Sequence, residues 1–381
     1  MDVLTVGIIT FQRAHNYGAV LQAYALLSTI KGLGYRAELI DYWPKYRDGH
    51  YNLVYFHLKS FFKNGASNFT AKGPIKEMLT FPSRYKQSLK FKSFRKNYLD
   101  VTNHPYRSGA DIPDKYDVII CGSDQIWRYH FLGNEGFDDV YFAKYPSNKT
   151  VIKISYSASM GDDDINEKAK KQLSELLENF DFISVREDSL LKLITPLTTK
   201  LPAAVLDPVF LLSADEWRRM IKKNSRKKKY LLFYQLLLNP EAEKLVKQIA
   251  KEKQLEIIHI GGVKRNANPF GLQKLKLSTG PLDFISLIAH ADYVVSTSYH
   301  GVVFAILFGK PFSALGFKGN FHRIRSLLTS LGIEKRLVEP NSDVYIDAID
   351  YTPVNTKLKK LKEDSLSFII QSLNTAGQDK T

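Results

Sequence analysis

The chain has 381 residues, 44% of them hydrophobic, and a formal net charge of +15 at pH 7. This length favours two domains with a sizeable core, and the longest apolar run, at 230–238, is far too short to span a bilayer. Cys121 is the single cysteine, so an intrachain disulfide and a cysteine-rich zinc site are excluded. The first residues lack a signal-peptide pattern, and the sequence therefore predicts a cytoplasmic protein with a buried thiol at position 121.

The first predicted elements form a β-α-β unit. Residues 4–11 have the composition of a strand, 17–34 that of a helix with a glycine exit, and 35–42 that of a second strand. Further strand-like segments follow at 118–121, 151–158, 182–187 and 204–212. Their alternation with polar and helical stretches predicts a parallel sheet, and we expect a first Rossmann-like domain at 1–215.

A basic, aromatic segment at 45–110 interrupts this alternation. It holds 13 basic and 3 acidic residues, so most of the net charge lies in a small part of the chain. We expect an insertion of basic helices here. Such a surface attracts anionic lipid headgroups, polyanions or acidic substrates. The composition leaves two alternatives open: a solvated helical face, or a surface that meets an anionic glycan or membrane and so places the protein at the inner membrane face.

A polar, charged stretch at 218–229 predicts the domain boundary. The β/α alternation then resumes, with strand-like segments at 230–238, 255–262, 292–298 and 311–315 and helix-like ones at 241–253, 281–290 and 301–309. This pattern predicts a second Rossmann-like domain at 230–345. An amphipathic helix is expected in the remainder, 346–381, and its return to the first domain is an open alternative. Two such domains face each other across a cleft, where ligands bind beyond the carboxyl ends of the strands.

His300 is the strongest candidate site residue. It follows the strand-like segment 292–298 and precedes an apolar helix opened by Gly301, so it stands at a helix N-terminus, with Ser298 in the same turn. Free backbone N–H groups and the helix dipole make such a place an anion site. A histidine at the carboxyl end of a strand is better placed for a ligand than one inside an apolar run, so we favour a functional role over a packing role.

The helix after His300 also indicates which kind of anionic ligand can bind there. Two-domain enzymes that use sugar nucleotides often carry a glutamate in this helix to hold the ribose hydroxyls, whereas here residues 302–308 read VVFAILF. The absence of a carboxylate argues against a nucleotide donor and for a smaller phosphorylated one.

Arg186 is the second candidate anion contact, because it follows the strand-like segment at 182–185. A guanidinium at that place can hold a carboxylate or phosphate through two parallel hydrogen bonds. A salt bridge to Glu187 or Asp188 is an equally open alternative.

The motif CGSDQIW, residues 121–127, is the third candidate. Ser123 and Asp124 can cap a helix there, and Asp124 can also serve as a general base toward a hydroxyl. Trp127 supplies a flat apolar face of the kind that stacks on sugars, and Gln125 lies between them. Both the capping role and the catalytic role of Asp124 stay open.

His15 and Asn16 occupy the first strand-to-helix turn, the place in the first domain that His300 holds in the second. Asn16 is a good N-cap, and its structural role is the favoured interpretation. The turn lacks the GxGxxG pattern, so a dinucleotide site is not supported.

Several motifs occur in a fixed order along the chain: NYGAVLQAYALL, GSDQIW, SYSASMG, SVREDS, LDPVFLL with Trp217 after it, and STSYHGVVFAILFGKPF followed by RIRSLLTSLGI. In this order they resemble the polysaccharide pyruvyl transferase family. The similarity covers most of the chain, and the segment at 45–110 is its least familiar part.

The resemblance implies an α/β fold of two Rossmann-like domains facing a cleft in a glycosyltransferase-B-like arrangement. It implies no metal and no bound cofactor, with phosphoenolpyruvate as the donor co-substrate. The implied product is a pyruvate ketal bridging two hydroxyls of one sugar in an exopolysaccharide or other cell-surface glycan. The resemblance leaves two acceptors open, a free glycan and a lipid-linked saccharide. By motif match, Arg186 and His300 are the implied donor-binding pair.

For the other positions the resemblance gives a motif match without a role. The full set of expected site residues is His300 and Asp124 as catalytic groups, with Arg186, Ser298, Gly301, His15, Asn16, Ser123, Gln125 and Trp127 as substrate-binding groups. Histidines titrate near neutral pH, which suits proton delivery to the donor or charge compensation on the departing phosphate.

Two alternatives compete with this interpretation. One is a glycosyltransferase of the same architecture that uses a nucleotide sugar, against which the missing helix glutamate argues. The other treats the basic segment at 45–110 as a nucleic-acid or membrane-surface binding module, since aromatics interleaved with lysines permit that. Such a module would have no need of Arg186 or His300 at strand ends, and we expect no nucleic-acid partner.

Overall fold

The computed structural model describes most of the chain. The described residues are 3–48, 72–129, 136–161, 164–221, 228–236, 240–261, 276, 278–316, 321–339 and 344–378. The basic segment expected at 45–110 and the boundary expected at 218–229 therefore lie partly outside the described residues, as does the end of the apolar run at 230–238.

The first domain is built on a parallel six-stranded sheet with the order β2-β1-β3-β4-β5-β6. Its strands are β1 (Thr5–Ile9), β2 (Arg36–Leu39), β3 (Val118–Asp124), β4 (Ile152–Ala158), β5 (Phe182–Val185) and β6 (Ala203–Ala204). Its helices are α1 (Tyr17–Gly32), α4 (Glu167–Leu177) and α5 (Asp188–Ile194). Side chains of α1 pack on one face of the sheet, and those of α4 and α5 pack on the other.

The second domain has a parallel five-stranded sheet with the order β11-β10-β9-β7-β8. Its strands are β7 (Tyr230–Gln235), β8 (Glu256–Gly261), β9 (Tyr293–Ser296), β10 (Phe312–Leu315) and β11 (Leu337–Val338). Its helices are α7 (Pro240–Glu252), α8 (Pro281–Ala289), α9 (Tyr299–Leu307) and α10 (Phe321–Leu331).

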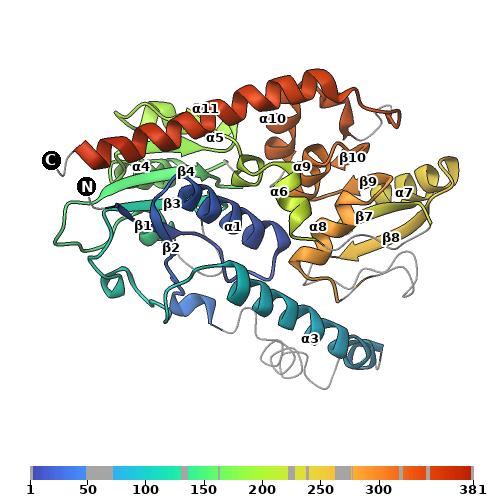
Figure 1. The fold of residues 1–381 in the computed structure, drawn as a ribbon, viewed down its shortest axis with the longest axis horizontal. Helices are drawn as coiled ribbons and strands as arrows, with labels where there is room; N and C mark the ends of the chain where they lie inside the picture. Colours follow the sequence, from blue (N-terminus) through green and yellow to red (C-terminus); the bar gives the residue numbers. More distant parts are fainter. Residues whose placement is uncertain are drawn as a thin grey trace.

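Three further helices lie outside these two units: α3 (Lys72–Tyr98), α6 (Ala214–Arg219) and α11 (Tyr351–Gln378). Short 3-10 helices are η1 (Lys45–Arg47), η3 (Gly109–Asp111), η5 (Asp139–Phe142), η6 (Thr195–Leu197), η7 (Pro208–Leu211) and η8 (Glu334–Arg336). Helix α11 runs along both domains (Figure 1), and its Ser365 hydroxyl accepts a hydrogen bond of 2.9 Å from the Leu206 amide of the first domain.

Both sheets follow the same doubly wound order. In each domain the first strand lies between the second and the third, so the direction in which successive strands are added reverses between β1 and β3 in one sheet and between β7 and β9 in the other. Ligands of such sheets bind outside the carboxyl ends of the strands at this reversal. The two Rossmann-like domains form the glycosyltransferase-B-like arrangement that the sequence predicts, and this expectation is confirmed.

An apolar cluster joins the two domains. The Tyr17 ring of α1 stacks on the Phe284 ring of α8, with centroids 4.7 Å apart and planes 5° from parallel. The Trp217 ring of α6 meets Phe304 of α9 edge-on at 5.2 Å. Large buried aromatic rings contribute much of the free energy of an interface, so this side of the domain contact is held by packing.

Two sequence expectations have clear outcomes in the core. Cys121 is fully buried, and burial raises the pKa of its thiol to about 12, which agrees with the inert thiol that was expected. The strand expected at 204–212 is wrong beyond Ala204. The Asp207 carboxylate accepts the Val209 amide and caps η7, and Pro208 supplies a favourable first helical residue, so the chain turns away from the sheet there.

The second sheet contains a buried histidine whose titration affects stability. Burial lowers the pKa of His259 to about 4, and its ring stacks on Phe233 at 5.0 Å. Because the unfolded chain binds this proton at higher pH, the free energy of unfolding should fall as the pH drops from about 6.5 to 4, by roughly 3 kcal/mol. His259→Phe keeps a stacked ring and should remove that part of the fall. Urea unfolding across this range tests it, and an unchanged pH slope in the variant would contradict it.

In the part of the chain that the structure describes, no helix combines the length and the apolar character needed to cross a membrane.

Candidate active site

The predicted site residues lie at the carboxyl ends of strands in both sheets. Asp124 ends β3, Arg186 follows β5, and His300 follows β9. Because the two sheets turn these ends toward each other, residues from both domains meet in one buried polar cluster. Asp207, after β6, lies at its centre.

Arg186 is buried, with a side chain only 1% exposed. Its Nη2 lies 2.9 Å from Asp207 Oδ2 and donates a hydrogen bond to the Ser123 hydroxyl. Its Nη1 lies 3.9 Å from Asp124 Oδ1, and its guanidinium stands over the Tyr299 ring at 4.9 Å. Arg186 thus pairs with Asp207 and Asp124, and the expected alternative of a salt bridge to Glu187 or Asp188 is not what the structure shows.

Asp207 is the carboxylate that contacts both Arg186 of the first domain and His300 of the second. Its side chain is fully buried, and Oδ2 lies 2.9 Å from Arg186 Nη2 and 3.3 Å from His300 Nε2. Burial by itself acts to raise the pKa of Asp207, but Arg186 and then His300 outweigh it and hold the pKa at about 2. Burial acts to lower the pKa of Arg186, but the negative charge of Asp207 outweighs it and raises that pKa. Both groups are therefore charged at neutral pH.

His300 occupies the first turn of α9 and reaches across to the first domain. Its imidazole is 8% exposed, meets the Tyr299 ring edge-on at 5.3 Å, and packs on the first turn of α1. A side-chain carbon added at Gly18 would overlap the ring at Nδ1. The imidazole is thus buried among polar groups between the domains, in contact with a carboxylate on one side and a helix N-terminus on the other.

Gly18 sets this contact, and a methyl group at that position should displace the imidazole. Gly18→Ala is expected to lower turnover at least tenfold, although alanine favours a helix over glycine by about 1 kcal/mol. Gly32→Ala on the same helix is the matched control, because a side-chain carbon there would meet nothing within 4 Å. Steady-state rates of the two variants test the contact, and equal rates would contradict it.

Asp124 and Ser123 have different positions in this cluster. Asp124 has a side chain 12% exposed, a backbone φ of 78°, and Oδ1 accepting the Gln125 amide at 2.9 Å. Ser123 is fully buried, donates to the Ser157 carbonyl at 2.8 Å and accepts from Arg186. The helix that these residues were expected to cap is wrong, since β3 runs through both and turns follow at 125–129. Ser123 positions Arg186 and is not open to a substrate.

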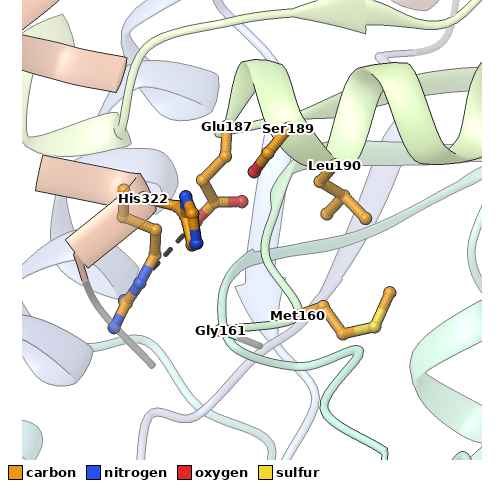
Figure 2. Close-up of a pocket in the computed structure, with 7 residues that line it drawn as sticks. Met160, Gly161, Glu187, Ser189, Leu190 and His322 are labelled. Carbon is orange, nitrogen blue, oxygen red and sulfur yellow. Dashed lines mark ion pairs between the residues drawn. The ribbon is translucent and has the colours of Figure 1, made fainter. Parts of the chain in front are cut away.

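A small pocket lies next to the cluster at the domain contact. Its lining residues are Met160, Gly161, Glu187, Ser189, Leu190, His322 and Arg323, and its volume is about 10 Å³, room for roughly one water molecule. Figure 2 shows Glu187 and Ser189 on the first-domain side and His322 on the other, with the ion pair to Glu187 drawn as a dashed line. That pair joins Arg323 Nε to Glu187 Oε1 at 3.9 Å.

Arg323 adds a second guanidinium to the site. It belongs to α10, its side chain is 10% exposed, and it lies 5.7 Å from the Tyr299 ring, which Arg186 also contacts. Burial is the main cause that lowers the pKa of Arg323, and Glu187 opposes it. Glu187 in turn accepts a hydrogen bond of 2.6 Å from the Ser159 hydroxyl.

The expected substrate contact of Trp127 is wrong, and Gly301 has a packing role. Trp127 is fully buried, donates from Nε1 to the Tyr141 carbonyl at 3.0 Å and stacks on Phe142 at 4.9 Å, so its ring belongs to the core and not to a sugar site. Gly301 packs against the Ser296 hydroxyl and the Tyr234 ring, where a side chain would not fit. It brings α9 close to its strand.

The remaining expected residues lie around the cluster. Ser298 is the N-cap of α9, and its hydroxyl hydrogen-bonds the Tyr234 side chain. Gln125 packs against Gly161, beside the pocket. Asn16 caps α1 by accepting the Ala19 amide at 3.2 Å, as expected. His15 stacks on Phe91 of α3 at 5.4 Å, and burial, followed by the Arg95 charge, lowers its pKa to about 4.

Two residues at the centre of the site were missed from the sequence. Asp207 carried a usable signal, because an aspartate directly before a proline at the end of a strand is a typical N-cap. Arg323 carried none, since its place beside Glu187 depends on how α10 meets α5 across the domain contact.

Comparison with solved structures finds distant relatives in fold. The glycosyltransferase SnogD from Streptomyces nogalater is 9% identical, with a TM-score of 0.43 and 99% of each chain covered. A UDP-GlcNAc 2-epimerase from Neisseria meningitidis, bound to UDP-GlcNAc, is 10% identical, with a TM-score of 0.46 and coverage of 97% of this chain and 99% of that one. These similarities are too weak to assign a function.

Sequence comparison is more specific. No curated protein sequence matches the chain significantly. A sequence model of the polysaccharide pyruvyl transferase family, however, matches residues 16–318, which include every residue of the cluster except Arg323. Because this match spans well over half of the chain, the protein belongs to the polysaccharide pyruvyl transferase family.

Proposed function

We propose that this chain is a ketal-forming pyruvyl transferase that uses phosphoenolpyruvate to modify a glycan, in exopolysaccharide or cell-surface glycan biosynthesis. One observation carries the proposal: a single carboxylate oxygen, Asp207 Oδ2, lies 2.9 Å from Arg186 Nη2 and 3.3 Å from His300 Nε2. A guanidinium of one domain and an imidazole of the other are thus held at one point. Family membership supports transfer of a pyruvyl group.

The arrangement suits a small donor with two anionic groups. Arg186 still has two nitrogens without a hydrogen-bond partner among the described residues, Nε and Nη1, and each can donate to an oxygen of a carboxylate or phosphate. His300 and the N-terminus of α9 offer the second anion contact. The donor would share the two guanidinia of the cluster, Arg186 and Arg323, with the three carboxylates Asp207, Asp124 and Glu187.

The proposed reaction balances without another reactant. A proton delivered to C3 of phosphoenolpyruvate leaves a cationic centre at C2, and a sugar hydroxyl attacks that carbon. The C2–O bond to phosphate breaks, and a second hydroxyl closes the ketal. Of the two hydroxyl protons lost, one replaces the proton used at C3 and the other leaves on phosphate. His300 is our candidate for proton delivery, and Asp124, the more exposed carboxylate, is our candidate base.

Among the described residues the site is closed, and we propose that it opens for the donor. A pocket of about 10 Å³ holds no three-carbon phosphate, and Arg186 and His300 are both buried. The aromatic contacts of Tyr17 and Trp217 hold the domains on one side, so we place the opening at the pocket, between α10 and α5.

The test is release of phosphate from phosphoenolpyruvate across a panel of sugar acceptors, with NMR of the product. We expect phosphate and a new methyl singlet only when donor and a suitable acceptor are both present. The proposal would be overturned if the protein released a nucleoside diphosphate from a nucleotide sugar and released no phosphate from phosphoenolpyruvate. That result would favour a glycosyltransferase.

Arg186→Lys should separate binding from chemistry. A lysine ammonium can still neutralise Asp207, so the fold should survive, but it lacks the planar fork that would hold the donor. We expect the KM for phosphoenolpyruvate to rise about 10- to 100-fold, from loss of one or two charged hydrogen bonds. Arg218→Lys, at an exposed pair with Asp215, is the matched control. A KM unchanged by Arg186→Lys would exclude Arg186 as the donor's ligand.

A further inference from the structure

Helix α3 presents an exposed face that combines lysines with apolar side chains. Its buried side carries Phe91 and Phe94, which are 1% and 3% exposed. On the opposite side Tyr85 is 53% exposed and Leu89 is 46% exposed. Residues 85, 89, 92 and 96 share one side of an α-helix, because they are four, three and four positions apart. Lys92 and Lys96 therefore flank Tyr85 and Leu89, and Lys86 lies next to them.

This face is positively charged, and the stretch of helix that carries it has no acidic residue. Residues 78–99 contain six basic residues and no aspartate or glutamate. Lys90 pairs with Asp283 of α8, and Arg84 is buried. Within the described residues, no ion pair is found for Lys86, Lys92 or Lys96. Three exposed ammonium groups thus surround two exposed apolar side chains.

The position of α3 connects this face to the active site. The helix lies along the outside of the molecule beneath both domains (Figure 1). From its inner side, Gln87 Nε2 donates to the Tyr17 hydroxyl at 2.7 Å and to the Thr279 carbonyl of the second domain at 3.1 Å. Phe91 stacks on His15, just before the first turn of α1, which contacts His300.

We propose that this face, formed by Tyr85, Lys86, Leu89, Lys92 and Lys96, docks on an anionic lipid bilayer. Lysines bind the headgroups, while a tyrosine and a leucine enter the boundary between headgroups and acyl chains. A leucine offers nothing to stack on a base, so a membrane explains the pattern better than a nucleic acid does. The acceptor then arrives as a lipid-linked saccharide, a conclusion that rests on the proposed function.

The test is flotation of the full chain with vesicles of phosphatidylcholine containing about 30 mol % phosphatidylglycerol, and with phosphatidylcholine alone. We expect binding to the anionic vesicles only, weakened by salt. The triple variant Lys86→Gln, Lys92→Gln, Lys96→Gln should bind roughly 100-fold more weakly, at about fivefold per lysine. The matched control removes the same charge from exposed lysines of α11, through Lys357→Gln, Lys359→Gln and Lys360→Gln, and should change binding only a few-fold.

Two results would overturn the inference. Equal losses in both triple variants would mean that vesicles respond to net charge alone. Failure of the wild type to float, together with tight binding of a single-stranded RNA oligonucleotide, would make α3 a nucleic-acid surface.

Thermal unfolding with and without phosphoenolpyruvate tests the active-site proposal separately from the membrane proposal. The rise in Tm caused by phosphoenolpyruvate should be the same in the wild type and the α3 variant. If the wild type shows no such rise but still floats with anionic vesicles, the proposed donor is wrong while the membrane surface stands.

Discussion

Asp207→Asn is expected to abolish donor turnover and to destabilise the protein by about 3 to 5 kcal/mol. The substitution keeps the shape of the side chain but removes the only fully buried carboxylate that contacts both Arg186 and His300 among the described residues. It leaves a guanidinium with a 1% exposed side chain short of its closest counter-charge. Phosphate release should fall at least 100-fold, because Arg186 and His300 both lose the group that orients them. Urea unfolding and rates at a temperature where both proteins are folded measure the two effects.

The pH dependence of stability gives the same substitution a second readout. The pKa of Asp207 is about 2 in the folded protein and would be about 3.9 in the unfolded chain. A carboxyl whose pKa is depressed by folding contributes stability above its unfolded value, and the contribution is lost as the pH falls toward the folded value. The wild type should therefore lose roughly 2 kcal/mol between about pH 4 and pH 2 that Asp207→Asn does not lose.

Asp215→Asn is the matched control for both readouts, because that carboxylate is 84% exposed. It should change stability by less than about 1 kcal/mol and leave turnover unchanged. An Asp207→Asn protein as stable and as active as this control would show that the buried link between the domains is dispensable.

His300→Gln is expected to lower kcat by roughly 100- to 10,000-fold, the usual contribution of a positioned acid or base. Glutamine can still contact Asp207 but cannot deliver a proton to carbon. The KM for phosphoenolpyruvate should change by less than about tenfold, since Arg186 and the N-terminus of α9 remain. This signature is the opposite of the one expected for Arg186→Lys.

His290→Gln makes the same chemical change at the end of α8, where the ring contacts its own helix at the Ser286 carbonyl, and should leave both constants unchanged. If His300→Gln kept the wild-type kcat and raised only the KM, the imidazole would be a binding group and the proton would have to come from elsewhere.

The position of the catalytic candidates could be predicted from the sequence because it follows from the fold. Once β5 and β9 are recognised as parallel strands, the residues after them, Arg186 and His300, must lie at the carboxyl edges of their sheets. The glycosyltransferase-B-like arrangement that the family resemblance implies then places both edges at the cleft between the domains. No knowledge of side-chain packing is needed for this step.

The partners of these residues could not be predicted in the same way. Asp207 was read as part of an apolar strand, although its proline neighbour and short side chain favour the cap that forms. Trp127 was expected to stack on a sugar, but Phe142 and Phe180, distant in sequence, enclose it. Arg323 meets Glu187 only because two domains dock, and no local pattern encodes that contact.

The basic segment shows a third case. Its charge was visible in the composition, but composition does not say which side of a helix faces solvent. The side chains of Phe91, Phe94 and Gln87 decide that orientation by packing and hydrogen bonding against both domains. Those contacts turn Lys86, Lys92 and Lys96 of α3 toward solvent.

A crystal structure of the chain with phosphoenolpyruvate tests the central claim most directly. We predict that the bound donor places one anionic group on Arg186 and the other at the imidazole of His300, with Asp207 still between the two side chains. Density for the donor elsewhere on the protein, with Arg186 and His300 still closed on Asp207, would contradict the account.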